Sequence, residues 1–195
     1  MHLAKSALQQ QNTTSGFNNN GHGYAGGLDV FYRDKKTIKN GDYWISYSYL
    51  DTKRDYRTYP ELSVPGFAST HNFSVVYKHW FGKLRSLAGV NFRYASPRVY
   101  NNPNTDVFNG EKMSSYKSLD VSWSFLYKQN VIFYAAVNNL PGFKQEFGRR
   151  YASFPDENGY YRSAAIESEA PRFFILACFV TLTSKGTATQ LDKIE

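Results

Sequence analysis

Residues that could carry out catalysis are scattered along this sequence instead of being grouped. Its 16 Asp and Glu residues include no pair at a spacing that fixes two carboxylates for general acid and base catalysis. Ser, His and Asp are present, but no segment has the pattern of a nucleophile elbow. The single cysteine, Cys178, permits no internal disulfide, and no Cys/His cluster has the spacing of zinc ligands. The sequence therefore predicts that the protein is not an enzyme and has no metal or other cofactor.

Aromatic and polar side chains gather instead in long, irregular segments, where they form a candidate ligand-contacting set. Rings beside arginines and asparagines can hold a sugar or an organic chelate by stacking and hydrogen bonding. An equally good interpretation is that these rings only pack the loops against one another. The set comprises Tyr56, Arg57, Tyr59, Tyr100, Asn101, Arg149, Arg150, Tyr151, Tyr160 and Tyr161.

The charge balance is basic, with 23 Lys and Arg against 16 Asp and Glu and a net charge of +7. Basic residues interleaved with aromatic ones can form a platform for single-stranded nucleic acid. Here the basic residues are divided between turns and loops, and no face collects them, so we expect no nucleic-acid partner. Aromatic residues at 17% and charged residues at only 20% exclude a wholly disordered chain. No window approaches 18 consecutive apolar residues, which leaves no candidate for a membrane-spanning helix.

Seven segments alternate between apolar and polar residues, which predicts seven β-strands. In the clearest one, Leu119, Val121, Trp123, Phe125 and Tyr127 alternate with polar neighbours. The other apolar sets lie within residues 28–32, 43–49, 73–81, 88–94, 131–137 and 174–182. None of the seven sets contains Asp, Glu, Lys or Arg, whereas the opposite phase carries charged residues.

This separation of charge predicts a sheet with one face toward lipid. We expect Val121, Trp123 and Phe125 to face lipid. The charged residues of the opposite phase would then face a lumen, and they include Asp29, Lys78, Arg93 and Asp120.

The connections between the predicted strands alternate strictly between short and long. Residues 34–41, 82–83 and 128–130 are short links, whereas 51–70, 96–115 and 140–171 are long and are expected to be structureless. Compact soluble domains seldom contain three such loops. Outer-membrane barrels have tight periplasmic turns and long extracellular loops, so the pattern predicts such a barrel and its orientation.

Aromatic residues at both ends of the apolar sets agree with this interpretation, because barrels carry aromatic girdles at the two membrane interfaces. We expect Tyr32, Tyr43, Phe81 and Tyr127 near the short turns, and Tyr49, Phe73, Tyr94 and Phe174 near the long loops. His79 is predicted at headgroup depth, as a surface or core histidine more readily than a catalytic one. Gly21, Gly23, Gly26 and Gly27 resemble a phosphate-binding loop, but a strand follows where that site needs a helix, so we expect them to let the chain turn at the barrel rim.

Four stretches resemble the late barrel of TonB-dependent outer-membrane receptors of Gram-negative bacteria. They are GYAGGLDVFYRDKKTIKNGDYWISYSYLDTKR (23–54), FASTHNFSV (67–75), YAAVNNL (134–140) and RFFILACFV (172–180). The resemblance implies a barrel of roughly 22 strands, a plug, and energised uptake of a siderophore, cobalamin or glycan-type substrate. It also implies partners: outer-membrane lipid, the N-terminal barrel and plug that this sequence lacks, the TonB complex acting through that plug, and the substrate.

We therefore predict an all-β protein, an antiparallel transmembrane barrel segment of about seven strands without a plug, located in the outer membrane. Residues 1–20 are expected to be a polar remnant of an extracellular loop, 21–183 the barrel segment, and 184–195 a flexible periplasmic tail. A segment of this kind is not expected to transport by itself. Two alternatives stay open: a small self-contained barrel or adhesin-like surface protein, and a soluble all-β binding module.

Overall fold

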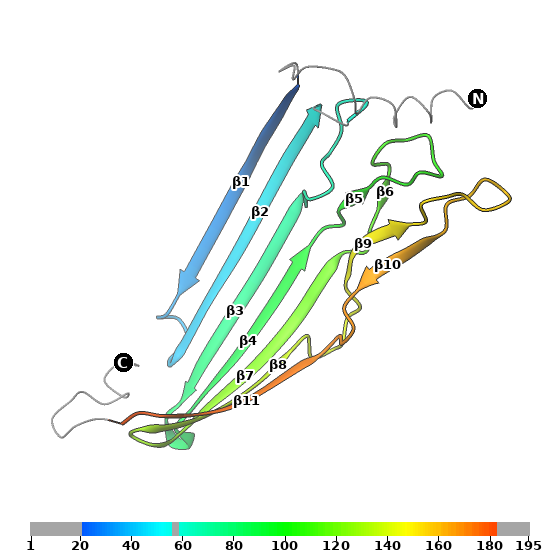
Figure 1. Cartoon of the computed structure of the whole chain (residues 1–195). Coiled ribbons are helices and arrows are strands. Elements are labelled where there is room, and N and C mark those ends of the chain that lie inside the picture. The colour runs from blue at the N-terminus through cyan, green and yellow to red at the C-terminus, as the bar shows by residue number, and fades with distance from the viewer. Residues whose placement is uncertain (1–20, 56–58, 183–195) are drawn as a thin grey trace.

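The computed structural model describes residues 21–55 and 59–182. The main body is a single antiparallel sheet of seven strands in the order β1-β2-β3-β4-β7-β8-β11, drawn as one curved layer in Figure 1. Its strands are β1 (His22–Asp34), β2 (Gly41–Asp55), β3 (His71–Phe81), β4 (Ser86–Ala95), β7 (Tyr116–Lys128), β8 (Val131–Asn138) and β11 (Phe173–Val180). The predictions of an all-β chain and of seven antiparallel strands are confirmed. The two end segments, residues 1–20 and 184–195, fall wholly outside the described residues.

Pairing between neighbouring strands brings all the predicted apolar sets onto one face of the sheet. Directly opposed residues in an antiparallel ladder point to the same side, so the register fixes the face of each residue. Across the six ladders the pairs include Leu28 with Tyr49, Tyr47 with Phe73, Val75 with Phe92, Val90 with Val121, Phe125 with Phe133, and Phe133 with Cys178. We call this side the apolar face and the opposite side the polar face. Leu182 was expected to belong to the last set, but the strand ends at Val180, two residues earlier.

The short links all lie at one end of the sheet, which we call the turn end. After β1, the Asp34 carboxylate accepts hydrogen bonds from the backbone N–H groups of Lys36 (2.6 Å) and Thr37 (2.9 Å). The link between β3 and β4 contains a short 3-10 helix, η1 (Gly82–Leu84), which Arg85 ends in the left-handed region (φ 49°). These local hydrogen bonds let a strand reverse within a few residues, which the alternating pattern requires.

The long links lie at the opposite end, the loop end, and here one prediction was wrong. They are not structureless: residues 96–115 contain the small ladder of β5 (Val99–Tyr100) with β6 (Glu111–Lys112), and 140–171 contain the ladder of β9 (Glu146–Tyr151) with β10 (Ser163–Glu167). Figure 1 shows both ladders beyond the ends of the main strands. The sequence did not predict these two ladders because neither contains an apolar alternation long enough to identify a strand.

The glycines near the start of the described chain also differ from expectation. They were expected to make a turn, but Gly23, Gly26 and Gly27 lie inside β1 and pair with β2. A Cβ atom at Gly23 would lie 2.9 Å from the backbone oxygen of Lys53, and one at Gly27 would overlap the backbone oxygen of Tyr49. Glycine here allows close approach of two strands rather than a reversal of the chain.

Among the described residues, neither a helix nor a second sheet packs on the apolar face, so the molecule has one layer where soluble domains have at least two. Large side chains on this face are open to solvent, for example Leu176 at 85% and Phe174 at 67% exposure. The strands at the two edges, β1 and β11, do not pair with each other, so the sheet is open rather than closed. No helix in the described part of the chain is long and apolar enough to cross a membrane.

Candidate functional site

Charged residues on the polar face are held in two ion pairs. Arg33 donates twice to the carboxylate of Asp42, from Nε (2.9 Å) and from Nη2 (2.6 Å). Arg93 Nη2 donates to Asp120 Oδ2 at 2.6 Å. Asp120 also accepts from Ser118 Oγ (2.6 Å) and from the backbone N–H that follows β8 (2.9 Å). Asp120 therefore ties β4, β7 and the end of β8 together.

Trp44 forms a second polar-face feature, because cations from both neighbouring strands lie over its ring. The Arg33 guanidinium lies 5.2 Å and the Lys78 ammonium 5.3 Å from the ring centroid. Both distances are in the range of cation–π attraction. Beside this ring is a hollow of about 310 Å³ that Lys78, Asp120 and Ser122 also line.

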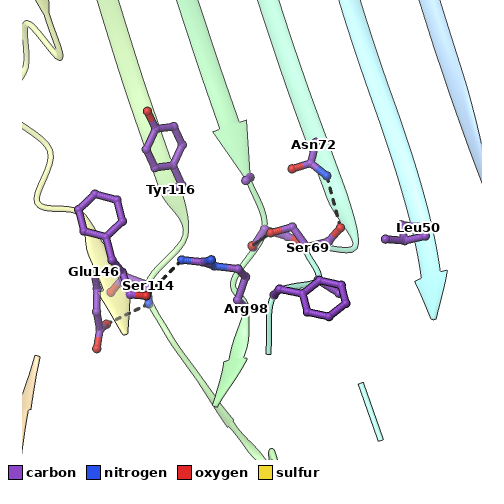
Figure 2. A pocket seen from close by; sticks show the side chains of 12 residues that line it. Leu50, Ser69, Asn72, Arg98, Ser114, Tyr116 and Glu146 are labelled. Carbon is purple, nitrogen blue, oxygen red and sulfur yellow. Dashed lines mark hydrogen bonds between the residues drawn. The ribbon is translucent and has the colours of Figure 1, made fainter. Parts of the chain in front are cut away.

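A larger cavity, of about 470 Å³, lies at the loop end over the polar face; we call it the loop-end cavity. Its floor consists of Leu50, just past the end of the pairing between β2 and β3, and of the polar-phase residues nearest the loop end in β3, β4 and β7, namely Asn72, Ala95 and Tyr116. Its walls come from the long links, and they are Phe67, Ala68, Ser69, Ser96, Arg98, Ser114, Glu146 and Phe147. Figure 2 shows the Arg98 side chain in the middle of this lining, pointing from the side of Ser69 toward Ser114 and Glu146. The cavity is therefore assembled from four strand ends and all three long links.

Arg98 is the one basic residue in this lining, and it has little to hold it. Its Nη2 donates to the backbone oxygen of Phe147 at 3.4 Å, which is beyond the usual length of a strong N–H···O bond. No carboxylate in the described residues lies within salt-bridge distance of Arg98. Most of the donor capacity of this half-buried guanidinium is therefore directed at the cavity and its solvent.

The acidic residue in the lining, Glu146, is already engaged on both oxygens. Oε1 accepts from Arg149 Nε at 2.8 Å, and Oε2 accepts from the backbone N–H of Ser114 at 3.2 Å (Figure 2). The hydrogen bond to Glu146 is the main cause that raises the pKa of the Arg149 guanidinium. Because Glu146 is neutralised by Arg149, the unpaired charge at the loop-end cavity is the positive charge of Arg98.

Several of the predicted ligand-contacting residues pack the long links together instead of lining the cavity. Arg149 lies over the Tyr100 ring at 5.5 Å, which joins β9 to β5. Tyr151 belongs to the same cluster: burial raises the pKa of its hydroxyl, and the neighbouring Tyr100 acts in the same direction. Tyr59 packs its ring edgewise against Phe108 with centroids 4.9 Å apart. For these residues the structure agrees with the loop-packing interpretation.

The remaining predicted residues are dispersed. The backbone of Tyr161 exchanges two hydrogen bonds with the Asn104 side chain, at 2.8 and 2.9 Å, and so links residues 96–115 to 140–171. Asn101, Arg150 and Tyr160 are exposed outside the cavity. Tyr56 and Arg57 lie outside the described residues. None of the described members of the predicted set lines the loop-end cavity.

Sequence reasoning missed the residues that do line it, above all Arg98, Glu146, Phe147 and Tyr116. They are spread over residues 98–147 and follow no period. Their position relative to the strands could have identified some of them. Several lining residues are the last residues of a strand or lie just beyond it, where a barrel has its rim.

The residues expected to face a lumen, Asp29, Lys78, Arg93 and Asp120, all lie on the polar face, whereas Val121, Trp123 and Phe125 lie on the apolar face. No group of three or more metal-ligating side chains occurs in the part of the chain that the structure describes. Comparisons with protein-family models, curated proteins and solved structures find no match. The loop-end cavity offers apolar walls, hydroxyl and amide groups, and the guanidinium of Arg98, which has no carboxylate partner among the described residues.

Proposed function

We propose that this chain forms an arc of an outer-membrane β-barrel, as part of a TonB-dependent type of receptor for substrate uptake. The apolar face contacts lipid, and the polar face lines the lumen. The observation that carries the proposal is the single-layer sheet whose seven apolar sets share one face without a charged residue. Such a face is stable in hydrocarbon and unstable in water.

The dimensions of this face support the proposal. Strand β3 has 11 residues, and a tilted strand needs about 9 to 11 residues to cross the hydrocarbon core. On the apolar face of β2, charged residues occur only past its aromatic end, beginning at Asp51. The charge-free part of the face is therefore a band of about the height of a membrane.

Aromatic residues border this band at both ends. At the turn end, the rings of Tyr32 and Tyr43 lie 6.1 Å apart. At the loop end, the rings of Tyr49 and His71 lie 5.4 Å apart, and His71 Nδ1 shares a hydrogen bond with the hydroxyl of Tyr47 at 2.9 Å. His79 makes the corresponding contact with Tyr77 at 2.8 Å near the turn end. Rings with a polar group favour the membrane interface, where one side is apolar and the other is hydrated.

Closure of the barrel requires further strands, because every unpaired backbone group at the edges of β1 and β11 would be costly in hydrocarbon. Seven alternating strands make β1 and β11 run in the same direction. A barrel that is antiparallel throughout therefore needs an odd number of closing strands. Copies of this arc joined edge to edge would meet in a parallel ladder, so closure by strands of another segment is favoured, and the arc alone does not transport.

Membrane fractionation tests the proposal directly. The full chain, joined to the closing strands of an outer-membrane barrel and expressed with an outer-membrane targeting signal in a Gram-negative host, is expected to sediment with the outer membrane in a density gradient and to resist alkaline carbonate. A variant with Arg at both Val90 and Val121, two paired residues at the centre of the apolar face, is expected to be lost from that fraction. Recovery of the unmodified chain as a soluble monomer would contradict the membrane assignment.

A further inference from the structure

The loop-end cavity has a composition that selects for a particular class of ligand. Its aromatic walls are open: Phe67 is 62% and Phe147 is 50% exposed. Leu50, Ala68 and Ala95 add apolar surface on the floor and side. A volume of about 470 Å³ lies within the usual size of small-molecule sites. A ligand that fills this space needs an apolar body, because an inorganic ion would leave the rings in water.

The charge of the cavity selects the polar end of that ligand. Arg98 has no carboxylate partner among the described residues, and its one protein contact is long. Both carboxylate oxygens of Glu146 are satisfied, so this residue does not attract a cation into the cavity. A guanidinium presents paired N–H donors that match the two oxygens of a carboxylate. The favoured polar group is a carboxylate, because its single negative charge is balanced by this one guanidinium, whereas a phosphate monoester carries about −1.5 to −2 at pH 7.

We infer that the loop-end cavity binds an organic anion in which a carboxylate is attached to an apolar, ring-sized body. Arg98 holds the carboxylate, and Phe67 and Phe147 contact the body. This inference rests on the proposed function for the location of the cavity, because only in a barrel does the cavity lie at the mouth of a lumen. A neutral sugar would use the rings but would leave the charge of Arg98 without a partner, so the anion is favoured over it.

Three probes separate the contribution of the carboxylate from that of the apolar body. Phenylacetate has both groups. 2-Phenylethanol lacks the charge, and acetate lacks the apolar body. Binding to the full chain, joined to its closing strands in lipid nanodiscs, is measured by equilibrium dialysis, with nanodiscs that hold a barrel without this chain as the blank. Phenylacetate is expected to bind most tightly. Because a charged hydrogen bond is lost, Arg98→Gln is expected to weaken phenylacetate binding roughly 10- to 100-fold while leaving 2-phenylethanol unchanged. Arg98→Lys is expected to restore part of the affinity, and Phe147→Ala to weaken both ring-bearing probes.

Arg150→Gln is the matched control, since Arg150 is an exposed arginine three residues beyond Phe147, the last residue of the cavity wall. It is expected to bind phenylacetate as the unmodified chain does, and far-ultraviolet circular dichroism verifies that each variant keeps its strand content. Equal binding of phenylacetate and 2-phenylethanol, equal affinity of Arg98→Gln and the unmodified chain, or no saturable binding at all would overturn the inference. If fractionation shows the chain to be soluble, the same titration in buffer still tests the cavity, so the two failures are distinguishable.

Discussion

A pair of adjacent substitutions in β7, Val121→Arg and Ser122→Arg, tests which face of the sheet contacts lipid. These residues are the sixth and seventh of the 13 in β7, so both lie near the middle of the strand and differ mainly in the face they occupy. Val121 opposes Val90 on one side and Val137 on the other, in the centre of the apolar face. Ser122 opposes Gly89 and Ala136 on the polar face.

The expected magnitudes follow from these surroundings. On the outer face of a barrel, an arginine at the membrane midplane costs about 2 to 4 kcal/mol. Ser122 lines the hollow of about 310 Å³, between two small residues, so a longer side chain there has room and reaches the carboxylate of Asp120 in the same hollow. A substitution at an open, hydrated position of this kind changes the free energy of unfolding by roughly 0.5 kcal/mol or less.

The assay is urea titration of the chain, joined to its closing strands, in lipid vesicles. Unfolding is followed by tryptophan fluorescence, to which Trp123, half exposed on the apolar face, contributes. Val121→Arg is expected to lower the free energy of unfolding from the vesicle by about 2 to 4 kcal/mol. Ser122→Arg is expected to change it several-fold less. Equal losses for the two variants, or a larger loss for Ser122→Arg, would refute the assignment of the apolar face to lipid.

Two further predictions concern the orientation of the arc and the contact that ties its strands together. The first uses single cysteines in a Cys178→Ser background and a membrane-impermeant thiol reagent on intact cells. A cysteine at Asn158, in the link between β9 and β10, is expected to react, whereas a cysteine at Lys36, at the turn end, is not. Labelling at Lys36 alone would show that the orientation is the reverse. Asp120→Ala is expected to lower the free energy of unfolding by about 1 to 3 kcal/mol, because it leaves the donors of four hydrogen bonds without their acceptor. Asp29→Ala, on the same face but exposed, is the control and is expected to change stability much less in the same urea titration.

The main sheet could be predicted from the sequence because its determinant is local. Successive side chains of a strand point to opposite faces, so an alternation such as Leu119–Tyr127 identifies both the strand and its buried or lipid-facing side. A one-residue slip of β1, β3 or β7 would move Asp29, Lys78 or Asp120 onto the apolar face, and the observed register avoids this. This single pattern predicted the seven strands of the main sheet and the face that each residue occupies. The lengths of the segments between the alternating sets predicted which end of the sheet carries the short links.

The misassigned glycines mark the limit of local reasoning. Gly23 and Gly27 have the composition of a turn, yet they lie in a strand because the backbone of β2 approaches them too closely for a side chain. That approach depends on the neighbouring strand, which composition alone does not encode.

The loop-end cavity was decided by tertiary structure alone. Arg98 meets the backbone of Phe147 across 49 residues of sequence, and Asn104 meets Tyr161 across 57. Such contacts depend on how three irregular links fold over the strand ends, and no backbone period constrains them. The sequence by itself therefore determined the strands and their two faces, because period-two geometry acts within each strand. The folded chain decided which side chains share the cavity, because packing between distant links brings them together.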